Sequence, residues 1–356
     1  MDTSAETLEQ PAAAGIISRA MIELTAQPFE LHNTMTSYWN DFPGIPAELE
    51  KVSSLIQTRT ASHNPIIADG LASLFNGEGK LLRPGILLLA AGFGKKQEKH
   101  YKLAACLEML HVATLIHDDI IDDSPLRRGK PTVHSRFGKH DAVLIGDYLL
   151  SQCFLLAAEY TNVDNARGLA KVIAHICSME IEQNSDRFRV NSSFRRYRRK
   201  IMGKSALLFS LSCHVGAHEA GVSKPVTEKL RRIGYSIGMA FQIIDDILDY
   251  VGEEGLVRKS LYNDLKTGLV TLPLICALEN EPSGDLKTKY FSGDFFSVDN
   301  TDSMIELIKK AGGIEGAKQY AASYTNRALL EITRLPSGTA RDSLEKLTAQ
   351  LLLRKY

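Results

Sequence analysis

Two groups of aspartates with the same spacing are the residues in this sequence most suited to chemistry. Asp118 and Asp122 belong to one Asp-Asp-x-x-Asp group and Asp245 and Asp249 to another, and each group follows an apolar run. Residues four apart lie on one face of a helix, so each group would present two carboxylates one turn apart. A solvated helix end would explain one such group, but its repetition favours a shared function.

Carboxylate oxygens are hard ligands that suit Mg²⁺, an ion that keeps several waters and shares the phosphate oxygens of a substrate. The chain also contains cations that would join such a site, namely Lys80, Arg83, Arg127, Arg128, Lys204 and Lys259. Together they predict a substrate that carries a diphosphate, with its hydrocarbon part received by apolar helices. The sequence contains no Ser-His-Asp or Cys-His pattern typical of covalent catalysis, and the turn from Gly77 to Lys80 lacks P-loop spacing.

The elements that would position these groups are helices. Apolar residues recur at steps of three and four over residues 101–121, and residues 142–158 and 169–183 continue in the same style. A helix that is apolar on nearly every side is buried in a larger bundle. Shorter patterns predict further helices at residues 47–59, 86–91, 303–311, 313–335 and a last one ending at Leu353. No stretch alternates as a strand does, so the sequence predicts an all-α fold.

The chain shows no linker that would separate two domains. We expect residues 1–45, with a short amphipathic helix at residues 16–24, to form a variable N-terminal arm, and residues 46–356 to form a single domain. Residues 280–303 are rich in Gly, Pro, Asp and Ser and are expected to form a surface loop.

Composition limits the class of protein. Of the 356 residues, 44% are hydrophobic and 24% charged, and the net charge of zero implies no global attraction to nucleic acid or to an anionic membrane. The apolar residues 142–160 are interrupted by Asp147 and Gln152, which predicts a buried helix and no stable membrane insertion. Five separated cysteines without a C-x-x-C pair predict reduced, buried thiols. The first residues resemble neither a secretory nor a transit signal, so we expect a cytoplasmic protein.

A basic stretch leaves another interpretation open. Residues 187–200 contain seven Lys or Arg residues with aromatic side chains between them, and five of the seven form the dense cluster 195–200. Such a run can follow a nucleic-acid backbone, but in a neutral protein a solvated helix face or a rim that attracts small anions is favoured. His214 and His218 lie four apart without the Glu of a zinc-protease helix, and we expect surface or hydrogen-bonded core histidines.

The ordered motifs resemble those of the trans-isoprenyl diphosphate synthases, the polyprenyl synthetase family, over residues 77–273. Besides the two aspartate groups, they comprise Gly79-Lys80-Leu81-Leu82-Arg83-Pro84, Arg127-Arg128-Gly129 and Phe241-Gln242. The resemblance implies an isoprenoid-synthase-type helical bundle around a central cavity. It also implies Mg²⁺-dependent head-to-tail condensation of isopentenyl diphosphate with an allylic diphosphate, in a homodimer. Leu269 departs from the family pattern, because a lysine is usual there.

The same resemblance implies a role for each matching residue. Isopentenyl diphosphate would be bound by Lys80, Arg83, His111 and Arg128. Mg²⁺ on the allylic diphosphate would be held by Asp118, Asp122, Asp245 and Asp249. That allylic diphosphate would also pair with Arg127, Lys204 and Lys259. Ser205 and Gln242 would direct oxygen dipoles at the developing carbocation.

Product length depends on the residues before the first motif. Ala113 and Thr114 stand one turn before Asp118, where short-chain members of the family often have aromatic residues. Small side chains there predict an open path for the growing tail and a medium- or long-chain polyprenyl product. A geranylgeranyl or farnesyl diphosphate synthase is the alternative, because a bulky residue deeper in the pocket, such as Phe154, would also limit the tail.

Three other functions remain to be weighed. A terpene cyclase shares the fold but normally carries an Asn/Ser/Glu metal motif where this chain has Asp245 and Asp249. A non-catalytic partner subunit of a heteromeric synthase typically loses aspartates, whereas this chain keeps both groups. A helical protein that binds nucleic acid through residues 195–200 would show salt-sensitive binding.

Overall fold

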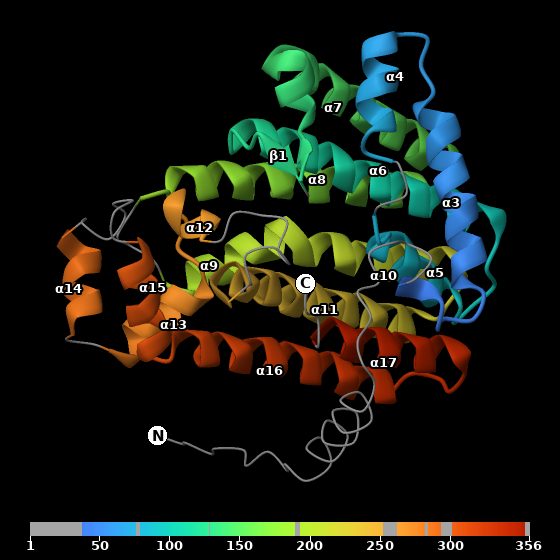
Figure 1. The fold of residues 1–356 in the computed structure, drawn as a ribbon. Helices are drawn as coiled ribbons and strands as arrows, with labels where there is room; N and C mark the ends of the chain where they lie inside the picture. The colour runs from blue at the N-terminus through green and yellow to red at the C-terminus, as the bar shows by residue number, and fades with distance from the viewer. Residues whose placement is uncertain are drawn as a thin grey trace. The chain divides into compact units, whose positions relative to one another are not determined.

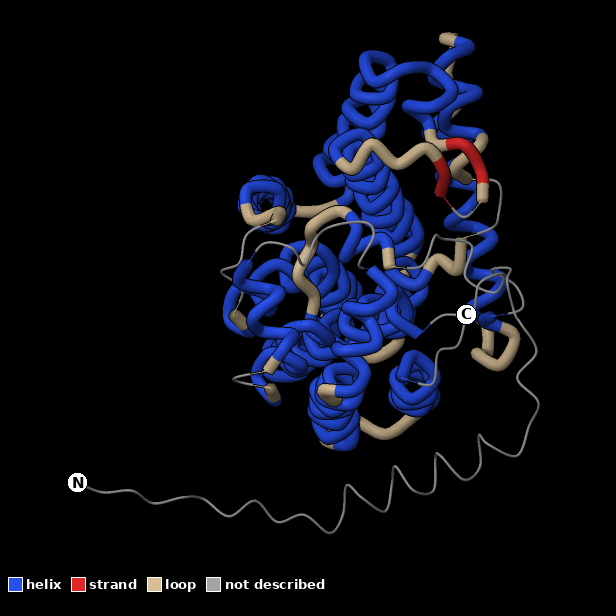
Figure 2. Tube along the Cα trace, turned by 60° about the vertical axis from the view of Figure 1, so that its left-hand side comes forward, coloured by secondary structure: helices blue, strands red, loops and turns tan. Residues whose placement is uncertain are grey.

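The computed structural model describes residues 38–75, 79–127, 129–188, 193–251, 262–281, 284–292 and 301–352, and the structural statements below concern this part of the chain. Helices make up most of it, with one short hairpin of two strands, drawn in red in Figure 2. The predicted all-α class is confirmed. The helix expected at residues 16–24 lies outside the described residues, as do Arg128 and Lys259.

The elements follow one another along the chain as Figure 1 labels them. They are α3 (Ile45–Thr60), α4 (Pro65–Ala72), α5 (Leu82–Ala91), α6 (Glu98–Ile121), β1 (Leu126–Arg127), β2 (Lys130–Pro131), α7 (Val133–Tyr160), α8 (Val163–Ser185), α9 (Phe194–Ile201), the π-helical segment η1 (Met202–Ala206), α10 (Leu207–Glu219), α11 (Lys224–Val251), α12 (Asn263–Lys266), α13 (Leu272–Asn280), α14 (Asp285–Ser292), α15 (Thr301–Lys310), α16 (Gly313–Thr333) and α17 (Thr339–Leu352).

Two hydrophobic clusters form the core. The larger involves α5, α6, α7 and α10 and contains Leu110 and Phe209, both with no exposed surface. The second involves α11, α13, α15 and α16 and contains Ile243 and Leu274. Helix α11 packs against α10 on one side and α16 on the other, as Figure 1 shows, and α6 packs against α7 and α5. The two helices that carry the aspartate groups, α6 and α11, are therefore both anchored by their apolar sides.

The chain reverses directly after α6. Asp123 adopts a left-handed backbone conformation (φ 50°), and the Thr132 hydroxyl donates to the carbonyl of Ser124 at 2.9 Å. Between them β1 and β2 pair antiparallel, with Arg127 opposite Lys130. This hairpin returns Arg127 to the end of the helix that carries the first aspartate group.

A close helix approach positions the second group. A Cβ added to Gly238 of α11 would lie 2.6 Å from the Cα of Ala206, so only glycine allows α11 to approach η1 this closely. Ser205 and Lys204 lie in η1, and Gln242 lies one turn beyond Gly238 on α11. A π-helical turn of this kind is frequent at functional sites, because it displaces side chains from the regular helical positions.

The predicted helices that lie within the described residues are present, and three expectations differ from the structure. The stretch 280–303, expected to be a loop, contains α14 and the start of α15. Cys177 is exposed, whereas Cys106, Cys153, Cys213 and Cys276 are buried as expected. A short helix and one surface thiol leave little trace in composition, because neither needs a long apolar pattern.

Helix α7 also differs from the prediction of a buried helix. Leu144, Phe154 and Leu155 are exposed by 53%, 46% and 49%. By length and composition the helix could cross a membrane. Only 39% of its most apolar 18-residue window is buried within the protein. An apolar side of α7 therefore faces outward from this chain.

Two aromatic residues just before the expected arm boundary at residue 45 pack into the core. Trp39 and Phe42, on the N-terminal side of that boundary, are fully buried in the larger core. The Trp39 indole N–H donates to the carbonyl of Lys80 at 2.6 Å. These residues therefore support the turn that precedes α5.

Candidate active site

The three aspartates of the first group have different environments. Asp119 is buried, and Arg127 donates to its carboxylate from Nε (3.0 and 2.9 Å) and from Nη2 (2.7 Å). Asp122 accepts a short hydrogen bond from Nη2 of Arg187, whose Nε is buried without a partner. Asp118 is half-buried on the last turn of α6.

Asp118 carries the most perturbed charge of the group. Burial, the charge of Glu180 and that of Asp122 together raise its pKa to about 7, although Lys204 and Arg127 act in the opposite direction. Burial and Asp122 also raise the pKa of Glu180 on α8. Carboxylates that crowd together at raised pKa favour the binding of a further cation.

The second group is tied into a buried hydrogen-bond network. Asp246 accepts from the Tyr197 hydroxyl at 2.7 Å and from Nε2 of Gln242 at 2.9 Å. The Ser205 hydroxyl donates to Oε1 of Gln242 at 2.6 Å. Burial and the charge of Asp264 raise the pKa of Asp246. The hydrogen bonds from Tyr197 and Gln242 lower it, but the net direction is upward.

The neighbouring aspartates of the second group are more accessible. Asp245 and Asp249 are half-buried. One carboxylate oxygen of Asp249 accepts the backbone N–H of Asp264 at 3.1 Å, which holds α12 against the end of α11. The middle aspartate is thus engaged inside the protein, and the two outer ones keep contact with solvent.

Lys204 joins the two groups. Burial by its surroundings lowers the pKa of Lys204, but Asp264, Asp118, Glu180 and Asp246 raise it by more, so that the net direction is upward. Its side chain is nevertheless exposed to solvent. Carboxylates from α6, α8, α11 and α12 thus act on one solvent-accessible ammonium.

The cations expected to bind isopentenyl diphosphate flank the start of α5. Lys80 lies 5.3 Å from the centre of the Tyr38 ring, and the Arg83 guanidinium lies 4.9 Å from that of Phe209. Arg83 is buried, which lowers its pKa to about 10 despite the opposing charge of Glu108, and its Nε has no hydrogen-bond partner. A buried guanidinium with an unused donor retains capacity for an anion.

Ala113 and Thr114 lie on α6 about one turn before Asp118 of the first group. Ala113 is fully buried, and the Thr114 hydroxyl donates to the carbonyl of His111 at 2.8 Å. Leu110 and Cys106, one and two turns earlier, are also buried in the larger core. Ala113 therefore places little side-chain volume one turn before Asp118.

The donor set fits Mg²⁺ in chemistry. Within the described ranges no three His, Cys, Asp or Glu side chains come together closely enough to hold a metal ion by themselves. The carboxylates of Asp118, Asp122 and Asp245 are hard donors, and Mg²⁺ commonly takes one or two carboxylates and completes its shell with water and phosphate oxygens. The site is therefore suited to a metal that arrives with a diphosphate.

The structure brings together residues that sequence reasoning did not assign. Glu180, Arg187, Tyr197 and Asp264 surround Lys204 or the two aspartate groups. Glu180 is an acid among apolar residues of a predicted helix, and this pattern could have marked it as a site residue. The others lie in a basic run or a polar turn, where no pattern distinguishes them.

The basic helix α9 is largely paired. Arg196 and Lys200 each lie 3.4 Å from the carboxylate of Asp186, and Arg199 lies 3.4 Å from that of Glu182. His214 and His218 stack with ring centres 5.6 Å apart. His218 is exposed, as expected of a surface histidine, whereas His214 is half-buried and its Nδ1 has no hydrogen-bond partner, contrary to the expectation. The ion pairs with Asp186 and Glu182 give α9 a structural role against the end of α8.

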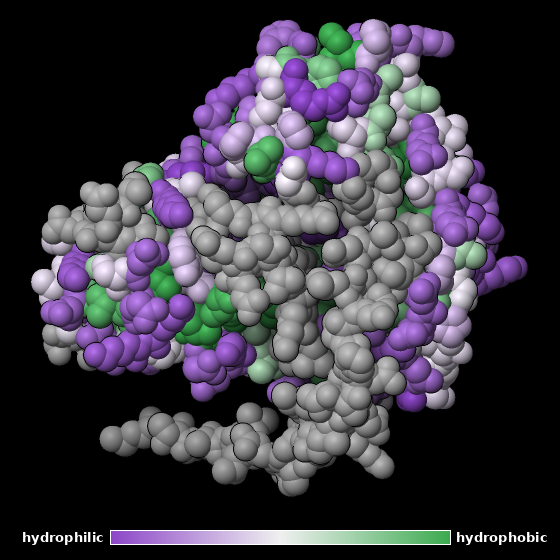
Figure 3. All heavy atoms as spheres, viewed as in Figure 1, coloured by the Kyte–Doolittle hydropathy of each residue, from purple (hydrophilic) through white to green (hydrophobic). Residues whose placement is uncertain are grey.

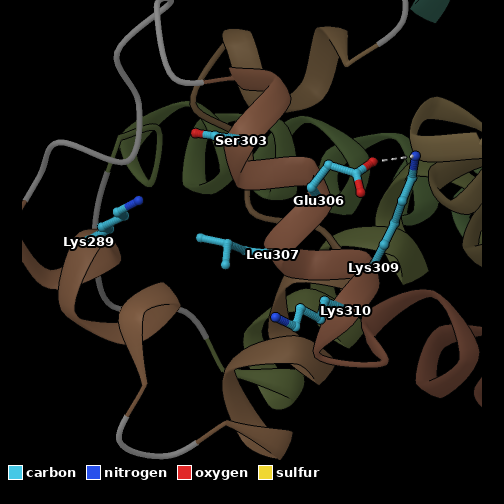
Figure 4. Close-up of a pocket in the computed structure, with 6 residues that line it drawn as sticks. All are labelled: Lys289, Ser303, Glu306, Leu307, Lys309 and Lys310. Carbon is cyan, nitrogen blue, oxygen red and sulfur yellow. Dashed lines mark hydrogen bonds and ion pairs between the residues drawn. The ribbon is translucent and has the colours of Figure 1, made fainter.

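A separate pocket of about 620 Å³ lies between α14 and α15 (Figure 4). It is lined by Lys289, Ser303, Glu306, Leu307, Lys309 and Lys310. On the face drawn in Figure 3, hydrophobic and hydrophilic side chains alternate over these helices. None of the predicted site residues lines this pocket, so it is not part of the candidate active site.

Comparison with known proteins decides the family. The family model for polyprenyl synthetase matches residues 64–308. The chain belongs to the polyprenyl synthetase family. Heptaprenyl diphosphate synthase component 2 of Bacillus subtilis is 34% identical over 310 residues, covering 87% of this chain and 88% of that protein.

Solved structures of this family have the same fold. The crystal structure of a geranylgeranyl pyrophosphate synthase from Lactobacillus brevis has a TM-score of 0.83 at 35% identity, covering 89% of this chain and 99% of that one. A polyprenyl synthase from Caulobacter crescentus, complexed with calcium and isoprenyl diphosphate, has a TM-score of 0.82 at 30% identity, covering 92% and 100%.

Membership of the polyprenyl synthetase family makes this chain a prenyltransferase, a trans-polyprenyl diphosphate synthase, as the motifs predicted. The predicted isoprenoid-synthase-type fold is likewise confirmed. Polyprenyl synthetases are soluble enzymes that use divalent metal ions and isoprenyl diphosphate substrates.

Proposed function

We propose that this polyprenyl synthetase is Mg²⁺-dependent and adds isopentenyl diphosphate head-to-tail to an allylic diphosphate, making a medium- or long-chain all-trans product as a cytoplasmic homodimer. The observation that carries the proposal is the position of Lys204. The charges of Asp264, Asp118, Glu180 and Asp246 raise its pKa, so carboxylates of both aspartate groups act on the same ammonium. A diphosphate with metal ions would complete this arrangement of opposite charges.

In this mechanism the two diphosphates are bound by different residues. Asp118, Asp122, Asp245 and Asp249 would hold Mg²⁺ on the allylic diphosphate. When bound, Mg²⁺ neutralises charge on the leaving diphosphate and so favours cleavage of the allylic C–O bond. Lys204 and Arg127, with Lys259 outside the described residues, pair with the same diphosphate.

The second substrate is positioned by residues at the start of α5 and on α6. Lys80, Arg83 and His111, with Arg128 outside the described residues, bind isopentenyl diphosphate. Its double bond attacks the allylic carbon, the new C–C bond forms and a proton is lost, which the released diphosphate accepts. Ser205 and Gln242 direct oxygen dipoles at the cation, and the apolar core nearby excludes water from it.

Product length and assembly rest on two apolar features. Ala113 is a small residue one turn before Asp118, and the Bacillus relative is named a heptaprenyl synthase, which together favour a longer product. The Lactobacillus relative is named a geranylgeranyl synthase, so that shorter product is the alternative. The exposed apolar side of α7, with Leu144, Phe154 and Leu155, suits a second copy of this chain.

One incubation tests the proposed function. The purified protein is mixed with labelled isopentenyl diphosphate and allylic primers of increasing length, with or without Mg²⁺, and the products are sized. We expect diphosphate release that requires Mg²⁺ and a ladder of products longer than 20 carbons. Absence of Mg²⁺-dependent release would contradict the proposal and favour a subunit that needs a second component, as the name of the Bacillus relative indicates for that protein.

A further inference from the structure

Four buried side chains from three elements form a single chain of hydrogen bonds, which we call the polar relay. It runs from Tyr197 on α9 through Asp246 and Gln242 on α11 to Ser205 on η1, with donor–acceptor distances of 2.7, 2.9 and 2.6 Å. Each of these residues is at most 6% exposed. The metal and diphosphate roles proposed above make no use of Tyr197 or Asp246.

The chemistry of each group determines which way the bonds point. The amide nitrogen of Gln242 can only donate, so the Asp246 oxygen opposite it accepts, as does the oxygen opposite the Tyr197 hydroxyl. The carbonyl oxygen of Gln242 then faces Ser205, and a carbonyl can only accept. The one hydroxyl hydrogen of Ser205 is therefore used on Gln242.

The consequence is a fixed polarity at Ser205. Its oxygen keeps lone pairs for a further partner but has no hydrogen left to donate. A lone pair stabilises a positive centre, whereas a hydroxyl hydrogen in the same place would repel it. Reversal of the Gln242 amide would reverse the Ser205 hydroxyl, and the Asp246 carboxylate opposes that reversal because it would then face a carbonyl oxygen.

We propose that Tyr197 and Asp246 are positioning residues that hold Gln242 and Ser205 so that Ser205 presents an oxygen, not a hydrogen, to the allylic carbocation. This rests on the proposed function, in which Ser205 and Gln242 lie beside that cation. Asp246 thus acts through the polar relay, while Asp245 and Asp249 of the same group act on the metal.

The main test is the isosteric change Asp246→Asn. Its amide can donate to Gln242, which lets the Gln242 amide turn over and frees the Ser205 hydrogen. We expect kcat to fall by about 100-fold, more than the roughly tenfold loss in Ser205→Ala, because a reversed dipole is worse than an absent one. The KM values and the Mg²⁺ concentration for half-maximal activity should stay within about twofold of the wild type.

A second variant keeps the charge of Asp246. Tyr197→Phe removes one donor to Asp246 and leaves the direction of the polar relay intact. It should lower kcat by about fivefold, because the Asp246 carboxylate is then held less firmly but still accepts from Gln242. The matched control is Tyr250→Phe, also a buried tyrosine hydroxyl, which accepts from Thr271 at 3.1 Å and lies outside the polar relay. Its kcat should match that of the wild type.

A binding measurement separates positioning from folding. An ammonium analogue of the allylic cation and its neutral carbon isostere are each titrated with Mg²⁺ and inorganic diphosphate. The preference of the wild type for the charged analogue should fall about tenfold in Asp246→Asn, with the neutral isostere bound normally.

Three outcomes would overturn the inference. They are an unchanged charge preference in Asp246→Asn, a smaller loss of kcat than in Ser205→Ala, or a shifted Mg²⁺ requirement, which would make Asp246 a metal ligand. Failure of the proposed function is recognised separately, because the wild type itself would then release no diphosphate.

Discussion

The Arg127 guanidinium donates three hydrogen bonds to the Asp119 carboxylate, at 3.0, 2.9 and 2.7 Å, and so holds the β1–β2 hairpin against the end of α6. The middle aspartate of the first group is thereby used inside the protein. Asp118 and Asp122 remain the candidates for metal binding, and Asp122 is held by Arg187. The second group has the same division, because Asp246 is the buried member there.

The Asp119–Arg127 pair should contribute to stability. Asp119→Asn removes the charge that Arg127 faces in a buried position and should lower the free energy of unfolding by about 1–3 kcal/mol. The control is Asp123→Asn, because Asp123 pairs with Lys139 at 2.8 Å on the surface and such pairs contribute about 0–1 kcal/mol. Urea unfolding measures both, and equal losses would show that Asp119 has no special role.

Asp118 should destabilise the metal-free protein above neutral pH. Its pKa of about 7 lies above the ordinary aspartate value of 3.8, so between these values the folded chain holds a proton that the unfolded chain has lost. Stability therefore falls as pH rises through this window. Asp118→Asn removes that cost and should stabilise the metal-free protein by about 1–3 kcal/mol at about pH 8, with a smaller gain at about pH 5.

Thermal unfolding across pH checks this expectation. Turnover should be lost in Asp118→Asn at every pH. Mg²⁺ with inorganic diphosphate should stabilise this variant less than the wild type, because one of the four proposed carboxylate ligands is then a neutral amide. A metal-free Asp118→Asn protein that is less stable than the wild type at about pH 8 would contradict the raised pKa.

Arg187 should compete with metal for Asp122. Arg187→Gln removes both a partner of the carboxylate and a nearby positive charge, so Mg²⁺ should bind about three- to tenfold more tightly in the absence of diphosphate. Arg196→Gln is the matched control, because it removes the same charge from a residue that pairs with Asp186. Titration calorimetry measures both, and equal affinities in the two variants would argue against competition.

Ala113 should set the length of the product. Ala113→Phe places an aromatic ring one turn before Asp118 and should shorten the longest product by at least one five-carbon unit. Ala105→Phe is the control, because Ala105 is equally buried on α6 two turns further from the aspartates. Overpacking should cost both variants about 1–3 kcal/mol of stability, so only a shift in product size counts. Identical product ladders would show that the tail takes another path.

The apolar side of α7 should hold two copies of the chain together. Leu155→Glu places a charge on that side and should convert the homodimer to monomer, as measured by light scattering. Phe291→Glu on α14 is the control, because Phe291 is 61% exposed and away from α7. A Leu155→Glu protein that stayed dimeric would place the interface elsewhere.

The sequence by itself determined the helical class, the two aspartate groups and the cations that accompany them. These are local patterns, because helical periodicity and the spacing of Asp118 and Asp122 depend only on the pitch of one helix. They were also sufficient to indicate the polyprenyl synthetase family, since the motifs keep their order along the chain.

Only the tertiary structure decided which carboxylate does what. Asp118 and Asp119 are neighbours in sequence, yet Arg127 donates hydrogen bonds to Asp119, whereas Asp118 has a pKa raised by burial and by Glu180. The difference arises because the hairpin after α6 turns back onto one side of that helix. Acids from four helices raise the pKa of Lys204, and the Tyr197 hydroxyl donates to Asp246 across 49 residues of chain. Such contacts depend on how the helices pack, and no spacing along one helix encodes them.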